Sequence, residues 1–250
     1  MLNRVPEVTA SFWIIKVLAT TVGETAADYL SADLKLGLSN TSYIMSGVLL
    51  IALFNQFRLK RYIPASYWIV VVLMSITGTL ITDRLVEELG VSLVTTTIAF
   101  SIVLAVVFAL WYFNEKTLAM HSINTVKREL YYWAAILFTF ALGTATGDLL
   151  AESLHLGYAW STILFGVLIG IVAISYYYFG LNAVLAFWIA YILTRPLGAS
   201  TGDLLSQPAG NGGFGLGTVG TSMLFLSIIL SLIIYISVKP RAYLQSLNVA

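Results

Sequence analysis

The sequence predicts an all-α integral membrane protein with eight transmembrane helices, arranged as four tandem repeats of two helices each. Composition is the first observation behind this prediction. Of the residues, 59% are hydrophobic and 10% are charged, whereas an ordinary soluble domain has about 25% charged residues; the mean hydropathy is +0.89. The second observation is a pattern that occurs four times, in which a Trp is followed by a Gly ten residues later and by an Asp fifteen residues later.

The four copies of this pattern contain no internal insertion. They are Trp13, Gly23 and Asp28; Trp68, Gly78 and Asp83; Trp133, Gly143 and Asp148; and Trp188, Gly198 and Asp203. The aspartates are 55, 65 and 55 residues apart (83−28, 148−83, 203−148), so a single shift of 120 maps the first two copies onto the last two. This spacing indicates a unit that was duplicated twice. We expect one transmembrane domain over 1–250, with repeats at 8–63, 64–123, 124–181 and 182–239.

Each repeat contains two segments of about twenty mostly apolar residues, the length that crosses about 30 Å of hydrocarbon. The first segments, which contain the Trp and end close to the Asp, are Val8–Asp28, Ser66–Asp83, Leu130–Asp148 and Ala183–Gly202. The second segments are Thr41–Phe57, Leu93–Phe113, Trp160–Phe179 and Val219–Val238. Their unbroken apolar runs differ from the residue-by-residue alternation of a membrane barrel strand.

Basic residues are concentrated on one side of the predicted helices. That side holds Arg4, Arg58, Lys60, Arg61, Lys116, Lys127, Arg128, Lys239 and Arg241, and the other side holds Lys35 and Arg84. By the positive-inside rule we expect both termini to be cytoplasmic. Since each repeat enters and leaves on the same side, the repeats would share one orientation about an axis along the membrane normal.

The four aspartates would then lie at one depth, near the outer face. If the first helices of the repeats line the axis, the aspartates form a ring; if the second helices do, they pair across repeat interfaces. Glycine and hydroxylated residues surround Asp28, Asp83, Asp148 and Asp203. Carboxylate, hydroxyl and carbonyl oxygens together suit protons or hard cations such as Mg²⁺, Ca²⁺ and Mn²⁺. The structural alternative is that small residues at four-residue spacing only pack helices together.

The first span carries the most ionisable groups. Glu24 and Asp28 are four residues apart and share one face, and Thr21 lies one turn before Glu24. We expect these three residues to bind the ion with the other aspartates; a metal would be held by Glu24, Asp28, Asp148 and Asp203. Lys16 lies two turns before Glu24, too deep for a loop charge. It is either functional or extends its ammonium to the cytoplasmic face.

The fourth repeat places Arg195 and Pro196 in the middle of a span. Pro196 removes a backbone donor, and we expect it to kink the helix. Arg195 needs a partner at that depth, and the candidates are Glu24, Asp28 and Asp203. A permanent salt bridge and a gating charge pair both remain open for it.

Several classes of protein are excluded or disfavoured. The chain has no cysteine, which excludes disulfides, thiolate metal sites and thiol catalysis. Hydrolase, P-loop and zinc-protease motifs do not occur, so we expect no enzymatic activity. Because the first apolar stretch carries Lys16 and Glu24 and repeats the pattern of the first helices of the later repeats, we expect no cleaved signal peptide. The basic loops are explained by topology and lipid contact, without nucleic acid.

The ends of the first helices carry a family resemblance. A Gly-x-x-x-Gly-Asp-Leu-Leu ending is complete at Gly143–Leu150 and Gly198–Leu205, whereas Ala27 and Thr82 precede the acids of the first two repeats. Four such tandem units resemble the bacterial membrane-anchored protein family made of four copies of a repeat of unknown function. The resemblance covers nearly the whole chain and implies the bacterial cytoplasmic membrane, but no function. A weaker similarity is to cation exporters with a Glu-x-Gly-Asp core.

These features favour a secondary transporter or exporter of a small cation, such as Mn²⁺ exchanged for protons. Glu24 and Asp28 would bind and exchange the ion, Asp148 and Asp203 would be their pseudo-symmetric partners, and Arg195 would compete with the ion. The alternatives are a passive cation channel and a membrane scaffold or sensor with structural acids. We expect no permanently bound cofactor, and a divalent cation would be a substrate; whether the chain forms an oligomer stays open. A transporter would have a polar cavity that reaches Glu24 from one side. A channel would have a continuous pore, and a scaffold would have acidic residues that are all paired.

Overall fold

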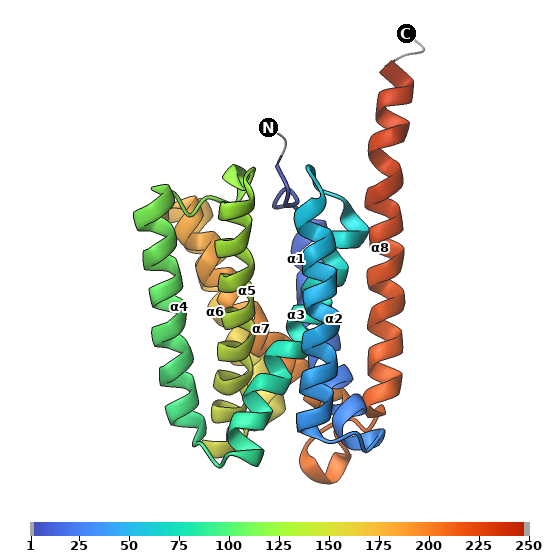
Figure 1. Cartoon of the computed structure of the whole chain (residues 1–250). Helices are drawn as coiled ribbons and strands as arrows, with labels where there is room; N and C mark the ends of the chain where they lie inside the picture. Colours follow the sequence, from blue (N-terminus) through green and yellow to red (C-terminus); the bar gives the residue numbers. More distant parts are fainter. Residues whose placement is uncertain (1–2, 248–250) are drawn as a thin grey trace.

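The computed structural model describes residues 3–247, which form eight α-helices joined by short connections (Figure 1). The helices are α1 Ala10–Asp28, α2 Leu38–Arg58, α3 Pro64–Asp83, α4 Leu93–Glu115, α5 Val126–Asp148, α6 Tyr158–Phe179, α7 Ala183–Ser206 and α8 Gly217–Leu247. Each predicted segment therefore falls on one helix. The beginning of α1 and the end of α8 lie at the same end of the bundle, and α8 extends beyond the other helices there (Figure 1).

Side-chain caps explain where several helices begin. The Thr9 hydroxyl accepts the N–H of Phe12 at 3.3 Å before α1, and the Thr125 hydroxyl accepts the N–H of Arg128 at 3.2 Å before α5. Such caps satisfy N–H groups that have no partner within the helix. Because of its cap, α5 begins at Val126, four residues before the predicted start at Leu130.

The first helix of each repeat defines an inner ring. Contacts join α1 to α3, α3 to α5, α5 to α7, and α7 back to α1. The second helices lie outside, each against the first helix of the following repeat: α2 on α3, α4 on α5, α6 on α7, and α8 on α1. In the most apolar stretch of α3, 56% of the residues are buried, against 17% in α2. Of the two alternatives left open by the sequence, the first helices are the ones that line the axis.

Glycines allow the inner helices to approach closely. A Cβ atom on Gly23 would collide with Ser75, one on Gly78 with Phe140, one on Gly143 with Arg195, and one on Gly198 with Thr20. In every case the glycine ten residues after the Trp faces the residue seven after the Trp of the next repeat around the ring. The repeated glycine is therefore explained by helix packing.

The Trp, the Gly and the Asp of each motif lie at different heights along the axis of the inner ring. At the beginnings of the inner helices, aromatic rings contact one another, with centroids 5.6 Å apart for Phe12 and Trp68 and 5.3 Å apart for Tyr67 and Trp133. The aspartates lie at the other end, where α1, α3 and α5 end.

A π-helical turn follows the aspartate in three repeats, at Tyr29–Asp33, Arg84–Glu88 and Leu149–Ser153. The fourth inner helix instead continues to Ser206 and is followed by a short 3₁₀ turn at Ala209–Asn211. π turns are rare and occur frequently at functional sites. The fourth repeat thus differs from the other three beside the acidic groups.

Seven of the helices in the described part of the chain are long and apolar enough to cross a membrane. The exception is α1, which the sequence also predicted to be a span. Lys16, Glu24 and several threonines lower the hydropathy of its most apolar stretch below that of the other seven helices. α1 is enclosed by α3, α7 and α8, so its polar residues face protein. The number of membrane crossings supported by length and composition is therefore seven.

Candidate functional site

One row of positions on each inner helix builds the candidate site. The row runs in four-residue steps, so its members share a helix face. It gives five levels with one residue from each inner helix, which we call the axial levels. From the aromatic end they are Phe12, Tyr67, Tyr132 and Phe187; Lys16, Val71, Ile136 and Tyr191; Thr20, Ser75, Phe140 and Arg195; Glu24, Thr79, Thr144 and Ala199; and Asp28, Asp83, Asp148 and Asp203. The first four levels are buried, with every residue at most 9% exposed.

The centre of the site is an ion pair between Arg195 and Glu24. Nη2 of Arg195 donates to Oε2 of Glu24 at 2.7 Å and to the hydroxyl of Thr144 at 2.6 Å. The Thr79 hydroxyl also accepts from this nitrogen. One guanidinium nitrogen from α7 is thus held by oxygen atoms from α1, α3 and α5. Such charge-assisted hydrogen bonds are stronger than neutral ones.

The fourth repeat differs from the other three at the level of Glu24, and this difference leaves room for the Arg195 side chain. At the level of Glu24, Thr79 and Thr144, α7 has only Ala199, and the arginine comes from one turn earlier. Gly143 of α5 lies directly against Cβ and Cγ of Arg195. Arg195 is fully buried, and its Nε and Nη1 atoms have no hydrogen-bond partner among the described residues. The helix continues through Pro196.

Carboxylates cluster beside this ion pair. One carboxylate oxygen each from Glu24, Asp148 and Asp203 lies within 4.8 Å of the others. Asp28 and Asp83 line an open pocket of about 220 Å³, together with Glu87. Within the described part of the chain, no side-chain hydrogen bond or ion pair engages any of the four motif aspartates. Oxygen ligands of this kind suit hard cations or protons.

Lys16 lies one axial level from Arg195, toward the aromatic end of the inner ring. Its Nζ atom is 4.4 Å from the centre of the Phe140 ring and 4.2 Å from that of Tyr191. The side chain is fully buried, and Nζ has no hydrogen-bond partner in the described structure. Contacts of a cation with ring faces offset part of the cost of burying it. The expectation that Lys16 might extend to the cytoplasmic face is wrong, because its ammonium is enclosed between two inner helices.

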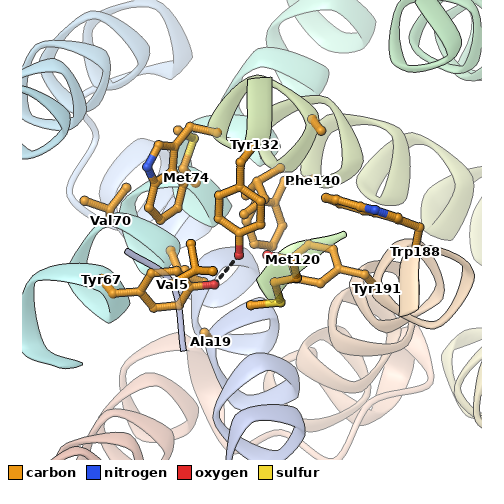
Figure 2. Packing of buried hydrophobic residues seen from close by; sticks show 14 of the residues in the cluster. Val5, Ala19, Tyr67, Val70, Met74, Met120, Tyr132, Phe140, Trp188 and Tyr191 are labelled. Atoms are coloured by element: carbon orange, nitrogen blue, oxygen red, sulfur yellow. Dashed lines mark hydrogen bonds between the residues drawn. The ribbon is translucent and has the colours of Figure 1, made fainter. Parts of the chain in front are cut away.

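Aromatic side chains close the axis beyond Lys16. The hydroxyls of Tyr67 and Tyr132 are hydrogen-bonded to each other, and the Tyr191 ring lies across this pair from Tyr67 (Figure 2). All three residues have no exposed surface. The axial levels therefore form a packed core here.

The structure brings together most of the residues named from the sequence. Carboxylate oxygens of Glu24, Asp148 and Asp203 lie within 4.8 Å of one another, and Arg195 pairs with Glu24, one of the three partners considered for it. Asp28 and Asp83 lie at the neighbouring pocket. Thr21 does not join the cluster, since its hydroxyl donates to the carbonyl of Val17 at 3.3 Å in its own helix.

Sequence reasoning missed two residues that hold Arg195, Thr79 and Thr144. A signal for them was present, because both lie eleven residues after the motif Trp, as Glu24 does. Reading the four repeats in register at this position would have identified them.

Fold and site together define a class: an all-helical protein of four two-helix repeats, with membrane-like helices and a buried polar axis. A family model described as a Repeat of Unknown Function (DUF347) matches residues 11–62, 66–117, 131–181 and 186–241. The chain belongs to this family of four-repeat proteins. Comparisons with curated proteins and with solved structures gave no match.

Proposed function

We propose that the protein is a secondary transporter of a small cation, exchanged for protons at the cluster of Glu24, Asp148 and Asp203. A divalent metal ion such as Mn²⁺ fits the three carboxylates best, because hard oxygen ligands with several negative charges favour such ions. In the proposed arrangement all eight helices cross the bacterial cytoplasmic membrane, the four repeats are parallel about the membrane normal, and both termini are cytoplasmic.

The observation that carries the proposal is how Arg195 is held. Its Nη2 atom is bound by Glu24, Thr79 and Thr144 from three helices, much as three oxygen ligands hold a metal ion. It lies beside Asp148 and Asp203, whose carboxylates carry no partner among the described residues. Arg195 is then an internal cation that neutralises Glu24 when the substrate is absent. A substrate ion would bind by competing with it.

The geometry argues against the two alternatives. A continuous channel needs an open axis, whereas the levels from Phe12 to Arg195 are packed and buried. A scaffold needs paired acids, whereas the aspartates of the cluster have no side-chain partner in the described chain. A pocket lined by Asp28 and Asp83 opens at the aspartate level, but its lining does not include Glu24. Alternating access therefore requires a conformational change that connects this pocket to the cluster.

Cation flux in proteoliposomes tests the proposal. Uptake of Mn²⁺, Mg²⁺, Ca²⁺, Na⁺ and K⁺ would be measured with and without a pH gradient, for the parent protein and for Asp148→Asn and Asp203→Asn. The matched control is Asp33→Asn, which removes an exposed acid from the same end of the molecule. We expect saturable uptake driven by the pH gradient, reduced at least tenfold in the two cluster variants and unchanged in the control.

Two results would reject the proposal. If none of these ions moves although the protein is folded, the acids are structural. If an ion moves without saturation and without dependence on the pH gradient, the protein is a channel.

A further inference from the structure

The segment that precedes α1 folds across the end of the inner ring that lies opposite the aspartates. The backbone N–H of Arg4 donates to the carbonyl of Ile123 at 2.9 Å, and the N–H of Tyr62 donates to the carbonyl of Asn3 at 3.0 Å. Val5 is only 2% exposed and belongs to the aromatic core, where it lies next to Tyr67 (Figure 2). Residues 3–7 lie outside the four matched repeats and cover the aromatic level.

A buried carboxylate holds this segment in place. Glu129 at the beginning of α5 has no exposed surface. Its Oε2 accepts from Nη1 of Arg4 at 2.7 Å, and its Oε1 accepts from Nε2 of Gln56 at 3.0 Å. The same Arg4 nitrogen donates to the carbonyl of Phe57 at 3.2 Å. Arg4 thereby links the segment to both α2 and α5.

Arg4 and Glu129 form the ion pair of this closure, and Glu7, the other charged residue of the segment, is exposed. Tyr62, in the connection between α2 and α3, is the ionisable residue bonded to the segment through its backbone. Burial raises the pKa of Tyr62 to about 12, so its phenol carries no charge near neutral pH. The Arg4 side chain keeps 11% exposure, and water can therefore reach the pair from outside.

The buried axis begins directly behind the segment. Beneath Val5 lies the hydrogen-bonded pair of Tyr67 and Tyr132, followed by Lys16. An ion or proton that crosses between the carboxylate cluster and this end has to pass these levels. The segment is thus the outermost barrier on the side that faces away from the aspartates.

We propose that residues 3–7 form a gate at the aromatic end of the axis, with the ion pair of Arg4 and Glu129 as its latch. This inference rests on the proposed transport function, because a gate at this end is needed only if the site opens alternately to both sides. Release of Arg4 from Glu129 frees the segment and uncovers the tyrosine pair. The gate is closed in the structure, and a pocket lined by Asp28 and Asp83 lies at the opposite end.

Thiol accessibility tests the gate without any transport assay. Because the chain has no cysteine, one cysteine can be introduced at Val5→Cys, a residue of similar size that lies in the segment itself and is 2% exposed. The rate of its reaction with a small charged methanethiosulfonate would be measured on the purified full-length protein, alone and combined with Arg4→Gln or Glu129→Gln. The exposed position Asn114→Cys reports the reactivity of an open thiol.

The matched control is Arg128→Gln, which breaks a peripheral ion pair with Glu115 (2.9 Å) near the same end. We expect Arg4→Gln and Glu129→Gln to increase the reaction rate of Val5→Cys at least tenfold, with no increase for Arg128→Gln. Glu129→Gln is the milder change, since an amide oxygen can still accept from Gln56.

The gate is overturned if the latch variants, folded as judged by unchanged elution and melting temperature, react at the parent rate. It is equally overturned if Arg128→Gln increases the rate as much as they do. Failure of the gate and failure of the proposed function remain distinguishable. Proton-driven flux with unchanged accessibility would remove only the gate, whereas increased accessibility without any flux would remove only the transport proposal.

Discussion

Arg195 and Glu24 form a buried ion pair of 2.7 Å, although the arginine lies one helical turn earlier in its repeat than the glutamate does in its own. The pair is fully enclosed, with side-chain exposures of 0% and 7%. Removing one partner of a buried ion pair costs about 3–5 kcal/mol, because the remaining charge stays buried without compensation. We therefore expect Arg195→Met and Glu24→Gln each to lower the melting temperature clearly.

The double variant is expected to recover much of this loss, since it leaves no uncompensated charge. Tryptophan fluorescence during heating in detergent would measure all four proteins of the cycle. Purely additive losses would show that the two side chains are not coupled, and would contradict the pairing.

Gly143 is expected to tolerate no side chain, because Cβ and Cγ of Arg195 occupy the space where its Cβ would lie. Gly143→Ala should destabilise the protein by about 1–3 kcal/mol, the usual range for overpacking, and should also displace Arg195. Gly166→Ala in α6 is the control, because no atom lies within 4 Å of its added Cβ. Thermal melting of both variants checks the prediction, and equal melting temperatures would refute the close contact.

The arrangement of helices could largely be predicted from the sequence. The spacing of Trp, Gly and Asp predicted four equivalent helices, and the composition predicted their membrane-like character. The sequence did not reveal which helices line the axis, because α2 and α3 are both apolar and only burial distinguishes them. Gly78 could have indicated the choice, since a close-packed glycine belongs to an inner helix.

The carboxylate cluster was predicted in outline, while its supporting residues were not. Thr79 and Thr144 look like ordinary hydroxyls in a helix, which commonly bond their own backbone. Glu129 lies at the start of a helix among the charges of a connection, where an exposed carboxylate is the usual expectation. Its burial depends on Arg4, which is 125 residues away in the chain, and no local pattern encodes such a contact.

Lys16→Met is expected to raise thermal stability. A buried ammonium without a hydrogen-bond partner costs several kcal/mol, and the contacts with the rings of Phe140 and Tyr191 return about 2 kcal/mol. Methionine has a similar length and no charge, so it fits the same space. The exposed Lys60→Met is the control for a general effect of the substitution. A melting temperature below that of the parent would mean that the ammonium is stabilising.

Asp28 and Asp83 should affect transport differently from Asp203. The first two line the open pocket, where their charges attract cations from solution, and such steering weakens as salt screens it. Asp203 is 7% exposed and lies in the cluster with Glu24 and Asp148, where screening is small. We expect Asp28→Asn and Asp83→Asn to reduce initial Mn²⁺ uptake several-fold at low ionic strength.

At high ionic strength the uptake by these two variants should approach the parent rate. Asp203→Asn should lose uptake to the same degree at every salt concentration, because the variant lacks a ligand. Initial rates in proteoliposomes at about 0.01 M and about 0.5 M of an impermeant salt compare the two regimes, in which the Debye length falls from about 30 Å to less than 10 Å. If the pocket variants lose uptake equally in both, Asp28 and Asp83 are ligands of the bound ion, and the cluster comprises all four aspartates.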